Sequence, residues 1–400
     1  MLIAIAAAKD WYLDQLDVNN AFLHGELNEE VYMCLPQGLY TEKPNQVCRL
    51  MKSLYGLKQA SRQWYAKLTN FLHSIGFIQS AFDHSLFSKK TASSFTVLLV
   101  YVDDILLAGK DHEHINEVKQ ILNSSFKIKD IGQLSFFLGF EVSRTKEGIH
   151  MNQRKYALDI LANRGMLAAK PCFTPMVKDI KLMFEQNDPI QEEESYRRIV
   201  GRLLYLTNTR PNIKFSVHLL SQFMQSLNTH HHKAINQILR YIKGSPTRGI
   251  FFPSKSNMQL QAFSDSDWAS CNLTRRSTTG YCIYIGASLI SWKTKKQSTV
   301  SRSSSEAEYR ALATTVYELQ WLTYILQDLQ ISIDKTANLF CDNEAARHIA
   351  SNLVFHERTK HIDIHCHVVR ERLQAGLFHL LPIQSTQQPA DIFTKPLEHV

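Results

Sequence analysis

The 400-residue sequence contains no pair of cysteines separated by only two residues. Its seven cysteines are scattered and odd in number, at Cys34, Cys48, Cys172, Cys271, Cys282, Cys341 and Cys366. Neither a disulfide framework nor a zinc ribbon is indicated, because both need paired cysteines at short or regular spacings. Reduced thiols are typical of the cytoplasm and the nucleus, so the composition favours those locations over secretion.

The chain also lacks an apolar run long enough to cross a membrane. Residues 1–8 are apolar, but no basic segment precedes them and Lys9 and Asp10 follow directly. This pattern does not match a signal peptide, and a membrane-spanning helix needs roughly 20 apolar residues. We expect the first residues to form the start of a buried helix, and we expect no membrane partner.

Some motifs of other nucleic-acid enzymes are missing. No GxxxxGK[ST] loop is present, which disfavours a helicase, and no His/Cys pairing suggests the zinc site of an integrase. The segment His356–His361 differs from the zinc-protease motif because three residues, not two, separate Glu357 from His361. A helix would place only His361 and His365 on one face, so zinc is not predicted and a helix facing nucleic acid is favoured.

Acidic residues are absent from one long stretch. Between Arg197 and Ser264 there are ten Lys and Arg and no Asp or Glu, although the net charge of the whole chain is only +8. Clustered cations favour nucleic acid as a partner, because phosphates release bound counterions to them. The alternative is a solvated basic helix surface. The nucleic-acid-binding residues that we predict are Arg202, Lys214, Arg240 and Lys243. We expect the aromatic residues of the stretch in its core, and His230–His232 on its surface.

Hydrophobic patterns divide the chain into three blocks, residues 1–165, 166–258 and 259–400. In the first block, Phe95–Val100 and Ile105–Leu107 predict the two strands of a hairpin, and Asp111 is expected to cap the next helix. The second block is mostly helical and basic. The third block alternates strands and helices, which predicts an α/β fold with a mixed sheet. Its expected elements are a hairpin across Gly286–Ser288, a helix from near Ser303 past Leu326, a strand at Leu339–Cys341, a helix at 357–373, a strand at 376–383 and a helical turn opening at Ala390.

Two adjacent acids, Asp103 and Asp104, lie at the tip of the first predicted hairpin. Apolar neighbours on both sides would make their repulsion costly, and a bound divalent metal would remove that cost. Asp17 ends another apolar stretch and supplies a third acid. Three acids holding two Mg²⁺ ions about 4 Å apart suit phosphoryl transfer. The alternative is a solvated turn that happens to be acidic.

Four acids of the last block lie at predicted structural edges: Asp265, Glu308, Asp342 and Asp391. Such edges can converge at one end of a sheet, and four carboxylates around two Mg²⁺ ions suit phosphodiester hydrolysis. Asp267 and Glu306 are rivals. Because Ser303 and Glu306 match a capping box, we assign Glu306 a structural role and Glu308 to the metal.

Four motifs in order resemble the reverse transcriptase of Ty1/copia-type retrotransposons: Leu16–His24, Val31–Pro36, Leu54–Ala60 and Tyr101–Asp104. Phe136–Glu141 resembles the family's primer-grip hairpin, and Tyr196–Gly201 and Thr209–Pro211 resemble its connection segment. The likeness implies a right-hand polymerase palm over residues 1–165 that lacks its fingers, a thumb or connection-like helical segment over 166–258, and a mixed five-stranded ribonuclease H-like sheet with helices over 259–400.

The resemblance also implies residue roles in the palm. Asp17, Asp103 and Asp104 would be polymerase metal ligands, and Phe22 would stand at the gate that rejects a 2′-hydroxyl. Gly56, Lys58 and Gln59 would lie on the helix that packs on template and incoming base, although Ser61 stands where family members usually have proline. Tyr101 would contact the substrate.

Ribonuclease H motifs are similar to four further segments: Ser264–Trp268, Ser304–Arg310, Cys341–Asn343 and Ala390–Lys395. Each contains one of the four acids, and the likeness also favours Glu308 over Glu306. Many ribonucleases H carry a histidine shortly before the last Asp, whereas residues 384–391 contain none. Slower product release or proton transfer is expected from that difference.

Together the motifs imply an RNA-directed DNA polymerase and RNA–DNA-hybrid ribonuclease of a retrotransposon polyprotein. Its cofactors would be Mg²⁺ or Mn²⁺, two per site, and its partners RNA template, DNA primer, RNA–DNA hybrid and deoxynucleoside triphosphates. It would work in a cytoplasmic virus-like particle or the nucleus. The alternative is a silent nucleic-acid-binding remnant. Only one cation, Lys9, precedes Asp17, so we expect this chain alone to lack a triphosphate grip and to be a poor polymerase. The ribonuclease H acids would need no residue from the missing fingers.

Overall fold

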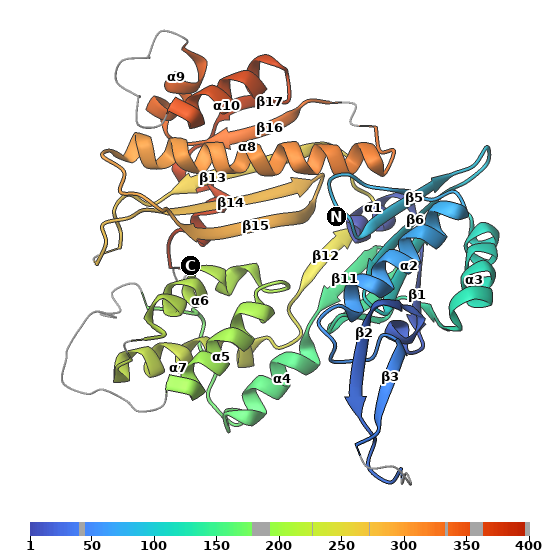
Figure 1. Ribbon diagram of the computed structural model, residues 1–400. Coiled ribbons are helices and arrows are strands. Elements are labelled where there is room, and N and C mark those ends of the chain that lie inside the picture. The colour runs from blue at the N-terminus through green and yellow to red at the C-terminus, as the bar shows by residue number, and fades with distance from the viewer. Residues whose placement is uncertain are drawn as a thin grey trace. The chain divides into compact units, whose positions relative to one another are not determined.

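The computed structural model (Figure 1) describes residues 1–39, 45–177, 193–225, 227–271, 273–332, 335–352 and 363–396. The chain forms two compact units. Unit 1 comprises Met1–Ala8, Leu138–Leu326 and Ser332–Val400, and unit 2 comprises Lys9–Phe137 and Gln327–Ile331. Among the helices of the described residues, none combines the length and apolar character that a membrane crossing requires.

Unit 2 is built on a six-stranded antiparallel sheet with the order β4-β5-β6-β7-β1-β8. Its strands are β1 (Tyr12–Val18), β4 (Ile78–Gln79), β5 (Leu86–Lys90), β6 (Phe95–Tyr101), β7 (Asp104–Gly109) and β8 (Ile128–Gln133). A separate hairpin joins β2 (Glu26–Cys34) to β3 (Val47–Lys52), the short helix η1 (Ala21–His24) precedes it, and β9 (Phe136–Phe137) ends this part of the chain.

Helices α2 (Ala60–Ser74) and α3 (His112–Phe126) share one hydrophobic core with the sheet of unit 2. Trp64 and Leu68 of α2 and Ile115 of α3 are buried there with Leu16 and Ile105. The predicted hairpin is confirmed, because β6 and β7 pair up to Tyr101 and Asp104. The predicted cap is also confirmed: the Asp111 carboxylate accepts hydrogen bonds from the first backbone N–H groups of α3.

Unit 1 begins with α1 (Leu2–Lys9), whose buried alanines and Ile5 confirm the predicted buried helix. Strands β10 (Phe140–Thr145), β11 (Gly148–Asn152) and β12 (Ile250–Pro253) form a small antiparallel sheet. The helices of the central part share one core. They are α4 (Arg154–Asn163), α5 (Glu193–Leu206), η2 (Pro211–Ile213), α6 (Lys214–Leu220), η3 (Ser221–Phe223) and α7 (Thr229–Gly244).

The C-terminal part of unit 1 is a mixed five-stranded sheet with the order β15-β14-β13-β16-β17. Strands β13 (Leu260–Ser266), β14 (Thr278–Ile285) and β15 (Ser288–Lys296) form an antiparallel meander, and β16 (Ala337–Cys341) and β17 (Phe378–Pro382) add parallel to β13. Helix α8 (Ser304–Asp328) runs along this sheet (Figure 1). The remaining helices are α9 (Glu344–Ser351), α10 (Asp363–Gln374), η5 (Ser385–Gln387) and η6 (Pro389–Phe393).

Residues 138–165, which the sequence grouped with the first block, cluster by their contacts with unit 1, because α4 packs its Ala157, Ile160 and Leu161 into the core of the helical segment. One expectation needs correction. His231 is not a surface residue but is 1% exposed. Its imidazole accepts from the backbone N–H of Asn228 and stacks on Phe223, so it caps α7 from within. The first part of the helix predicted at 357–373 lies outside the described residues, which include it as α10 from Asp363.

Candidate active sites

Four predicted acids come together at one edge of the five-stranded sheet. Asp265 lies one residue from the end of β13, and Asp342 follows β16 directly. Because β13 and β16 are parallel neighbours, their carboxyl ends meet at the same edge. Glu308 reaches this edge from the second turn of α8, and Asp391 from η6. We call Asp265, Glu308, Asp342 and Asp391 the acid cluster.

Glu308 is the most strongly perturbed acid of the cluster. Its side chain is buried at 6% exposure, and one carboxylate oxygen accepts from the backbone N–H of Ser266 at 3.2 Å. Its other oxygen, Oε2, has no hydrogen-bond partner among the described residues. Burial, followed by the charges of Asp265 and Asp342, raises the pKa of Glu308 to about 9. A metal-free cluster therefore keeps a proton on Glu308 at neutral pH.

Neighbouring groups partly stabilise the charges of Asp265 and Asp391. The Thr394 hydroxyl donates to Asp265, and burial together with the charges of Asp391 and Asp342 raises the pKa of Asp265 to about 6. The Lys395 ammonium lies 2.8 Å from an Asp391 oxygen. Burial alone would lower the pKa of Lys395, but its bond to Asp391 and the charges of the acid cluster raise it overall. The Lys395 ammonium thus supplies a positive charge beside the acid cluster.

The donor set fits a hard divalent cation. Glu308, Cys341 and Asp342 each bring one potential ligand atom within 4.8 Å of the others. The unpartnered Glu308 oxygen needs a cation or a proton, and carboxylate oxygens are the ligands that Mg²⁺ and Mn²⁺ prefer. Burial raises the pKa of the Cys341 thiol to about 12, so it stays protonated and is a poor ligand for these ions. The oxygens of the acid cluster would therefore hold the metal.

Contacts separate the two rival acids from the cluster. Glu306 bonds the guanidinium of Arg310 at 2.8 Å and accepts from the backbone N–H of Arg302. Its own N–H bonds the Ser303 hydroxyl, so it works at the start of α8, although the predicted capping box closes on Arg302 rather than on Ser303. Asp267 accepts from the Thr278 N–H and the Ser270 hydroxyl, which fixes the loop after β13.

Sequence reasoning missed a glycine that positions Asp391. Gly280 on β14 pairs with Asp265, and η6 passes directly over it. A Cβ at Gly280 would lie 2.6 Å from Thr394 Cγ2 and 2.9 Å from Phe393 Cβ, closer than real contacts allow. Only glycine lets η6 approach. The alternation of side chains around this residue could have suggested a close contact, but not its partner.

We predict that Gly280→Ala pushes η6 outward and with it Asp391. The expected destabilisation is about 1–3 kcal/mol, the usual cost of overpacking, and metal binding by the acid cluster should weaken. Thermal unfolding with and without Mg²⁺ measures both effects. Gly201→Ala is the matched control, because a Cβ there meets nothing within 4 Å and should be neutral or stabilising. Equal behaviour of the two variants would contradict the packing argument.

In unit 2, Asp17 and Asp104 are direct cross-strand partners on β1 and β7. Since Leu16 and Ile105 point into the core shared with α2 and α3, the two acids face the opposite side of the sheet. Asp103 is exposed in the two-residue turn between β6 and β7. Burial raises the pKa of Asp104, the charges of Asp103 and Asp17 add to the rise, and a hydrogen bond from Gln15 opposes it. The three predicted acids therefore form one electrostatic group.

The turn that carries Asp103 is held in an unusual conformation. Val102 has a φ of 57°, in the left-handed region that β-branched residues rarely adopt. The Trp64 indole donates to the Val102 carbonyl at 2.7 Å, and the Val18 N–H donates to the Asp103 carbonyl at 2.9 Å. These bonds from α2 and β1 fix the aspartates relative to Asp17.

Several other residues were predicted to belong to the palm site. Phe22 packs partly on the core, with its ring 5.1 Å from that of Tyr55, and Tyr101 is 57% exposed at the end of β6. The placement of Gly56, Lys58 and Gln59 on a helix is wrong: α2 begins at Ala60, and the three residues form turns before it. Gly56 has a φ of 95°, which a helix cannot contain. Ser61 lies in the first turn of α2.

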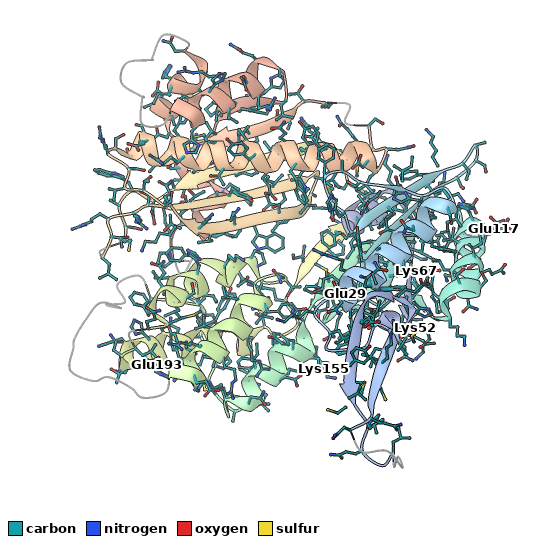
Figure 2. All side chains as sticks on the ribbon, viewed as in Figure 1. Glu29, Lys52, Lys67, Glu117, Lys155 and Glu193 are labelled. Atoms are coloured by element: carbon teal, nitrogen blue, oxygen red, sulfur yellow. The ribbon has the colours of Figure 1, made fainter. Side chains whose placement is uncertain are left out.

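Several residues of the basic segment make internal contacts. Arg202 lies over the Tyr156 ring, Lys214 donates to Thr207, and Arg240 donates to the Lys170 carbonyl. Arg210 is 1% exposed and bonds Ser245, so it belongs to the core rather than to a charged face. Arg197 pairs with Glu193, which is labelled in Figure 2. Lys243 is half-buried at the end of α7.

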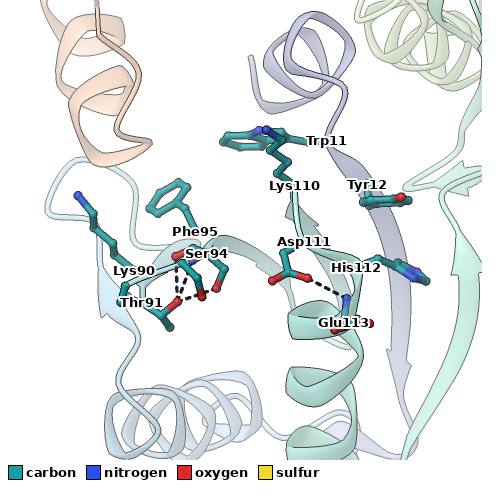
Figure 3. Close-up of a pocket in the computed structure, with 12 residues that line it drawn as sticks. Trp11, Tyr12, Lys90, Thr91, Ser94, Phe95, Lys110, Asp111, His112 and Glu113 are labelled. Carbon is teal, nitrogen blue, oxygen red and sulfur yellow. Dashed lines mark hydrogen bonds between the residues drawn. The ribbon is translucent and has the colours of Figure 1, made fainter.

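A further concavity of about 690 Å³ lies in unit 2, lined by the start of β1, the β5–β6 turn and the start of α3 (Figure 3). The Tyr12 and His112 rings lie 4.7 Å apart at its side. Tyr12 pairs with Gly109, whereas Asp17 pairs with Asp104, so about 17 Å of strand separates the cavity from the aspartates. The motif at His356–His361 lies outside the described residues.

Comparison with known proteins identifies the family of the chain. Residues 1–178 match the family model described as reverse transcriptase (RNA-dependent DNA polymerase). The chain is 44% identical, over 99% of its length, to the Retrovirus-related Pol polyprotein from transposon RE1 of Arabidopsis thaliana, and 37% identical to that of transposon TNT 1-94 of Nicotiana tabacum over 98%. It covers 27% and 30% of those two proteins, so it spans less than a third of their length.

A shorter relative and a solved structure extend the comparison. A putative transposon Ty5-1 protein of Saccharomyces cerevisiae is 30% identical and is covered completely by 76% of this chain. A foamy viral protease-reverse transcriptase solved in complex with RNA/DNA hybrid shares the fold, with a TM-score of 0.50 at 11% identity over 94% of this chain and 44% of that one. The predicted fold class is confirmed. The chain belongs to the family of copia-type retrotransposon Pol proteins.

Proposed function

We propose that the chain carries two metal-dependent phosphoryl-transfer sites, an RNA-directed DNA polymerase site in unit 2 and an RNA–DNA-hybrid ribonuclease site in unit 1. The observation that carries the proposal is the convergence of four acids, distant in sequence, on one sheet edge, where a buried Glu308 oxygen has no hydrogen-bond partner among the described residues. Buried carboxylates that raise one another's pKa cost stability, and such groups are typical of functional sites. The substrates would be RNA or DNA template with primer, deoxynucleoside triphosphates and the resulting hybrid.

The acid cluster would hold two Mg²⁺ or Mn²⁺ ions. When bound, such ions supply an activated water and neutralise charge on the leaving oxygen. The chain itself positions the acids that would hold the ions. Strands β13 and β16 fix Asp265 and Asp342, and Gly280 lets η6 bring Asp391 close. Lys395, 2.8 Å from Asp391, balances part of the negative charge of the acid cluster and would have to yield part of that contact to a bound cation.

The polymerase site would use Asp17, Asp103 and Asp104 in the same way. Trp64 and Val18 hold the turn, so that the three carboxylates present a fixed group on the open face of the sheet. Phe22 would stand beside the sugar of an incoming nucleotide and Tyr101 beside the primer end. We propose that hybrid cleavage is the stronger activity of the chain by itself, because all four acids of the cluster belong to unit 1. Weak primer extension stays a prediction.

Nucleic-acid binding should depend on the basic segment. We predict that replacing Arg202, Lys214, Arg240 and Lys243 by glutamine lowers hybrid affinity, and flattens the slope of log affinity against log salt by up to about one unit per lost phosphate contact. Because Arg202, Lys214 and Arg240 also make contacts within the protein, Lys243 should account for most of the change. Fluorescence anisotropy over a salt series measures the slope.

The exposed Lys146, outside the segment, provides the control for this prediction as Lys146→Gln. An unchanged slope in the fourfold variant would mean that the segment is an ordinary solvated surface. The experiment that tests the two catalytic sites is an assay of hybrid cleavage and primer extension on one purified sample with Mg²⁺.

A further inference from the structure

A buried polar side chain, Gln15, lies in the middle of β1 and is only 5% exposed. Strand alternation puts it on the face of the sheet that carries Asp17. On this face its direct partner on β7, Leu106, and the residue two places earlier on β1, Leu13, are both buried. Gln15 therefore lies where the buried apolar part of the face meets its acidic end, and it falls outside the motifs that predicted the polymerase site.

The Gln15 carboxamide holds one of the polymerase acids. Its Nε2–H donates to Asp104 Oδ1 at 3.2 Å. Asp104 pairs directly with Asp17 and lies two residues from Leu106 on β7, so Gln15 reaches it as a diagonal neighbour. The Asp104 carboxylate therefore has a like charge on one side and a hydrogen-bond donor on the other, and the donor fixes its orientation.

This hydrogen bond occupies only one oxygen of Asp104. Among the residues that the structure describes, none donates a hydrogen bond to the second oxygen, Oδ2. A carboxylate that a neighbour orients in this way keeps lone pairs available for an ion. Three carboxylates, one of them held with a free oxygen, fit a hard divalent cation, which takes oxygen ligands.

The other end of the Gln15 carboxamide is not satisfied. Its Oε1 atom is buried and has no hydrogen-bond partner in the part of the chain that the structure describes. A buried amide oxygen without a partner lowers stability, and an apolar side chain of similar length would avoid that loss. A polar side chain that lowers stability beside three acids is typical of a functional position rather than of a packing position.

The backbone is also irregular at this residue. The pairing of β1 with β8 shifts register between Gln15 and Leu16, whose partners are Gly132 and Asp130. Such bulges re-aim a side chain and are frequent next to active sites. The pairing of β1 with β7 continues without a shift from Tyr12 to Asp17. The spacing between Gln15 and Asp104 is therefore set by a regular pair of strands.

We propose that Gln15 is a positioning residue of the polymerase site, which orients Asp104 as a ligand of the divalent metal through the bond from Nε2 to Oδ1. Its buried carboxamide acts through Asp104 and does not contact the substrate. The inference rests on the proposed polymerase function, because that function assigns the acids of unit 2 to a metal. Loss of the carboxamide should weaken metal binding without making the metal-free fold less stable, whereas loss of a packing residue would lower stability.

The test uses the full chain with Asp265→Asn and Asp342→Asn, which removes two acids of the acid cluster so that metal binding reports on unit 2. Gln15→Met is made in this background, because methionine has a similar length, no donor and only a weak acceptor. The matched control is Gln133→Met, the same change at an exposed position of β8 in the same sheet. Electron paramagnetic resonance measures Mn²⁺ binding, and thermal unfolding is followed without metal.

Gln15→Met should bind Mn²⁺ about tenfold more weakly than the background protein, the lower end of the usual loss when the partner that orients a ligand is removed. Its melting temperature without metal should be equal or higher, and Gln133→Met should stay within about twofold in Mn²⁺ affinity. Equal Mn²⁺ affinity in the two variants would overturn the proposal. A lower melting temperature of Gln15→Met, or its failure to fold, would assign Gln15 to packing and overturn the proposal as well.

Asp104→Asn in the same background distinguishes this inference from the proposed function. If the background protein binds no Mn²⁺, or Asp104→Asn binds it equally well, the metal site of unit 2 is wrong and the role of Gln15 is wrong with it. If Asp104→Asn loses Mn²⁺ binding and Gln15→Met retains it, the role of Gln15 alone is wrong and the polymerase site stands.

Discussion

Asp265→Asn, Asp342→Asn and Glu308→Gln should each slow cleavage of the RNA strand of a hybrid by more than about a hundredfold. Each change removes a carboxylate oxygen from the set that would hold the metal, and even indirect supports of such sites commonly cost 10- to 100-fold. Cleavage of a labelled RNA–DNA hybrid with Mg²⁺ measures the effect. Nucleic-acid binding without metal should change little, since none of these side chains lies on a basic surface.

Glu306→Gln is the discriminating control for this prediction. It breaks a buried ion pair with Arg310 and should lower thermal stability, but it should leave cleavage within about tenfold of wild type below the melting temperature. A result in which Glu306→Gln abolishes cleavage while Glu308→Gln is active would reverse the assignment of the two glutamates.

Asp103→Asn or Asp104→Asn should abolish primer extension in the same way. The change removes charge from a group of three carboxylates in which burial, and then the charges of Asp103 and Asp17, raise the pKa of Asp104. Phosphoryl transfer relies on charge neutralisation and positioning. The assay is single-nucleotide incorporation at high triphosphate concentration.

The exposed Glu29, labelled in Figure 2, provides the control for extension as Glu29→Gln on β2. Hybrid cleavage by the two aspartate variants should equal that of the wild type, because the acid cluster contains no residue of unit 2. Extension at the wild-type rate by Asp103→Asn or Asp104→Asn would remove these residues from the polymerase site.

The sequence was most informative where local patterns decide the structure. An apolar run rich in strand-forming residues predicted the β6–β7 hairpin with Asp103 at its tip. The ends of apolar stretches predicted that Asp265 and Asp342 lie at strand ends. Parallel neighbours bring strand ends together, so the acid cluster could be expected before its geometry was known. The choice of Glu308 over Glu306 likewise followed from helix-capping chemistry.

Local sequence patterns could not predict contacts between segments that are distant in the sequence. Nothing in the segments around Gly280 indicates that η6 passes over it, and the contact of Lys395 with Asp391 depends on that passage. The turns before α2 were mistaken for helix because Gly56 does not by itself reveal a φ of 95°. His231 is polar and was expected at the surface, yet a stack on Phe223 and a capping bond offset its burial.

The raised pKa values also determine how the metal-free chain responds to pH. Glu308 has a pKa of about 9 in the folded state against 4.5 as its ordinary value, and that of Asp265 is about 6 against 3.8. The folded state therefore binds these protons more tightly than the unfolded state. This contribution to stability is fully present below about pH 4 and is lost as pH rises toward 9. Saturating Mg²⁺ should remove most of the slope, because it replaces the protons.

The most direct measurement is calorimetric titration of Mg²⁺ or Mn²⁺ into the wild-type chain and Glu308→Gln, at several pH values between about 6 and 9 and in buffers of different ionisation enthalpy. The account predicts that binding tightens as pH rises and releases a proton near neutrality, because the metal displaces the proton on Glu308. Glu308→Gln should bind more weakly, without the corresponding proton release. Binding that is independent of pH and identical in the two proteins would contradict the claim that the acid cluster is a metal site.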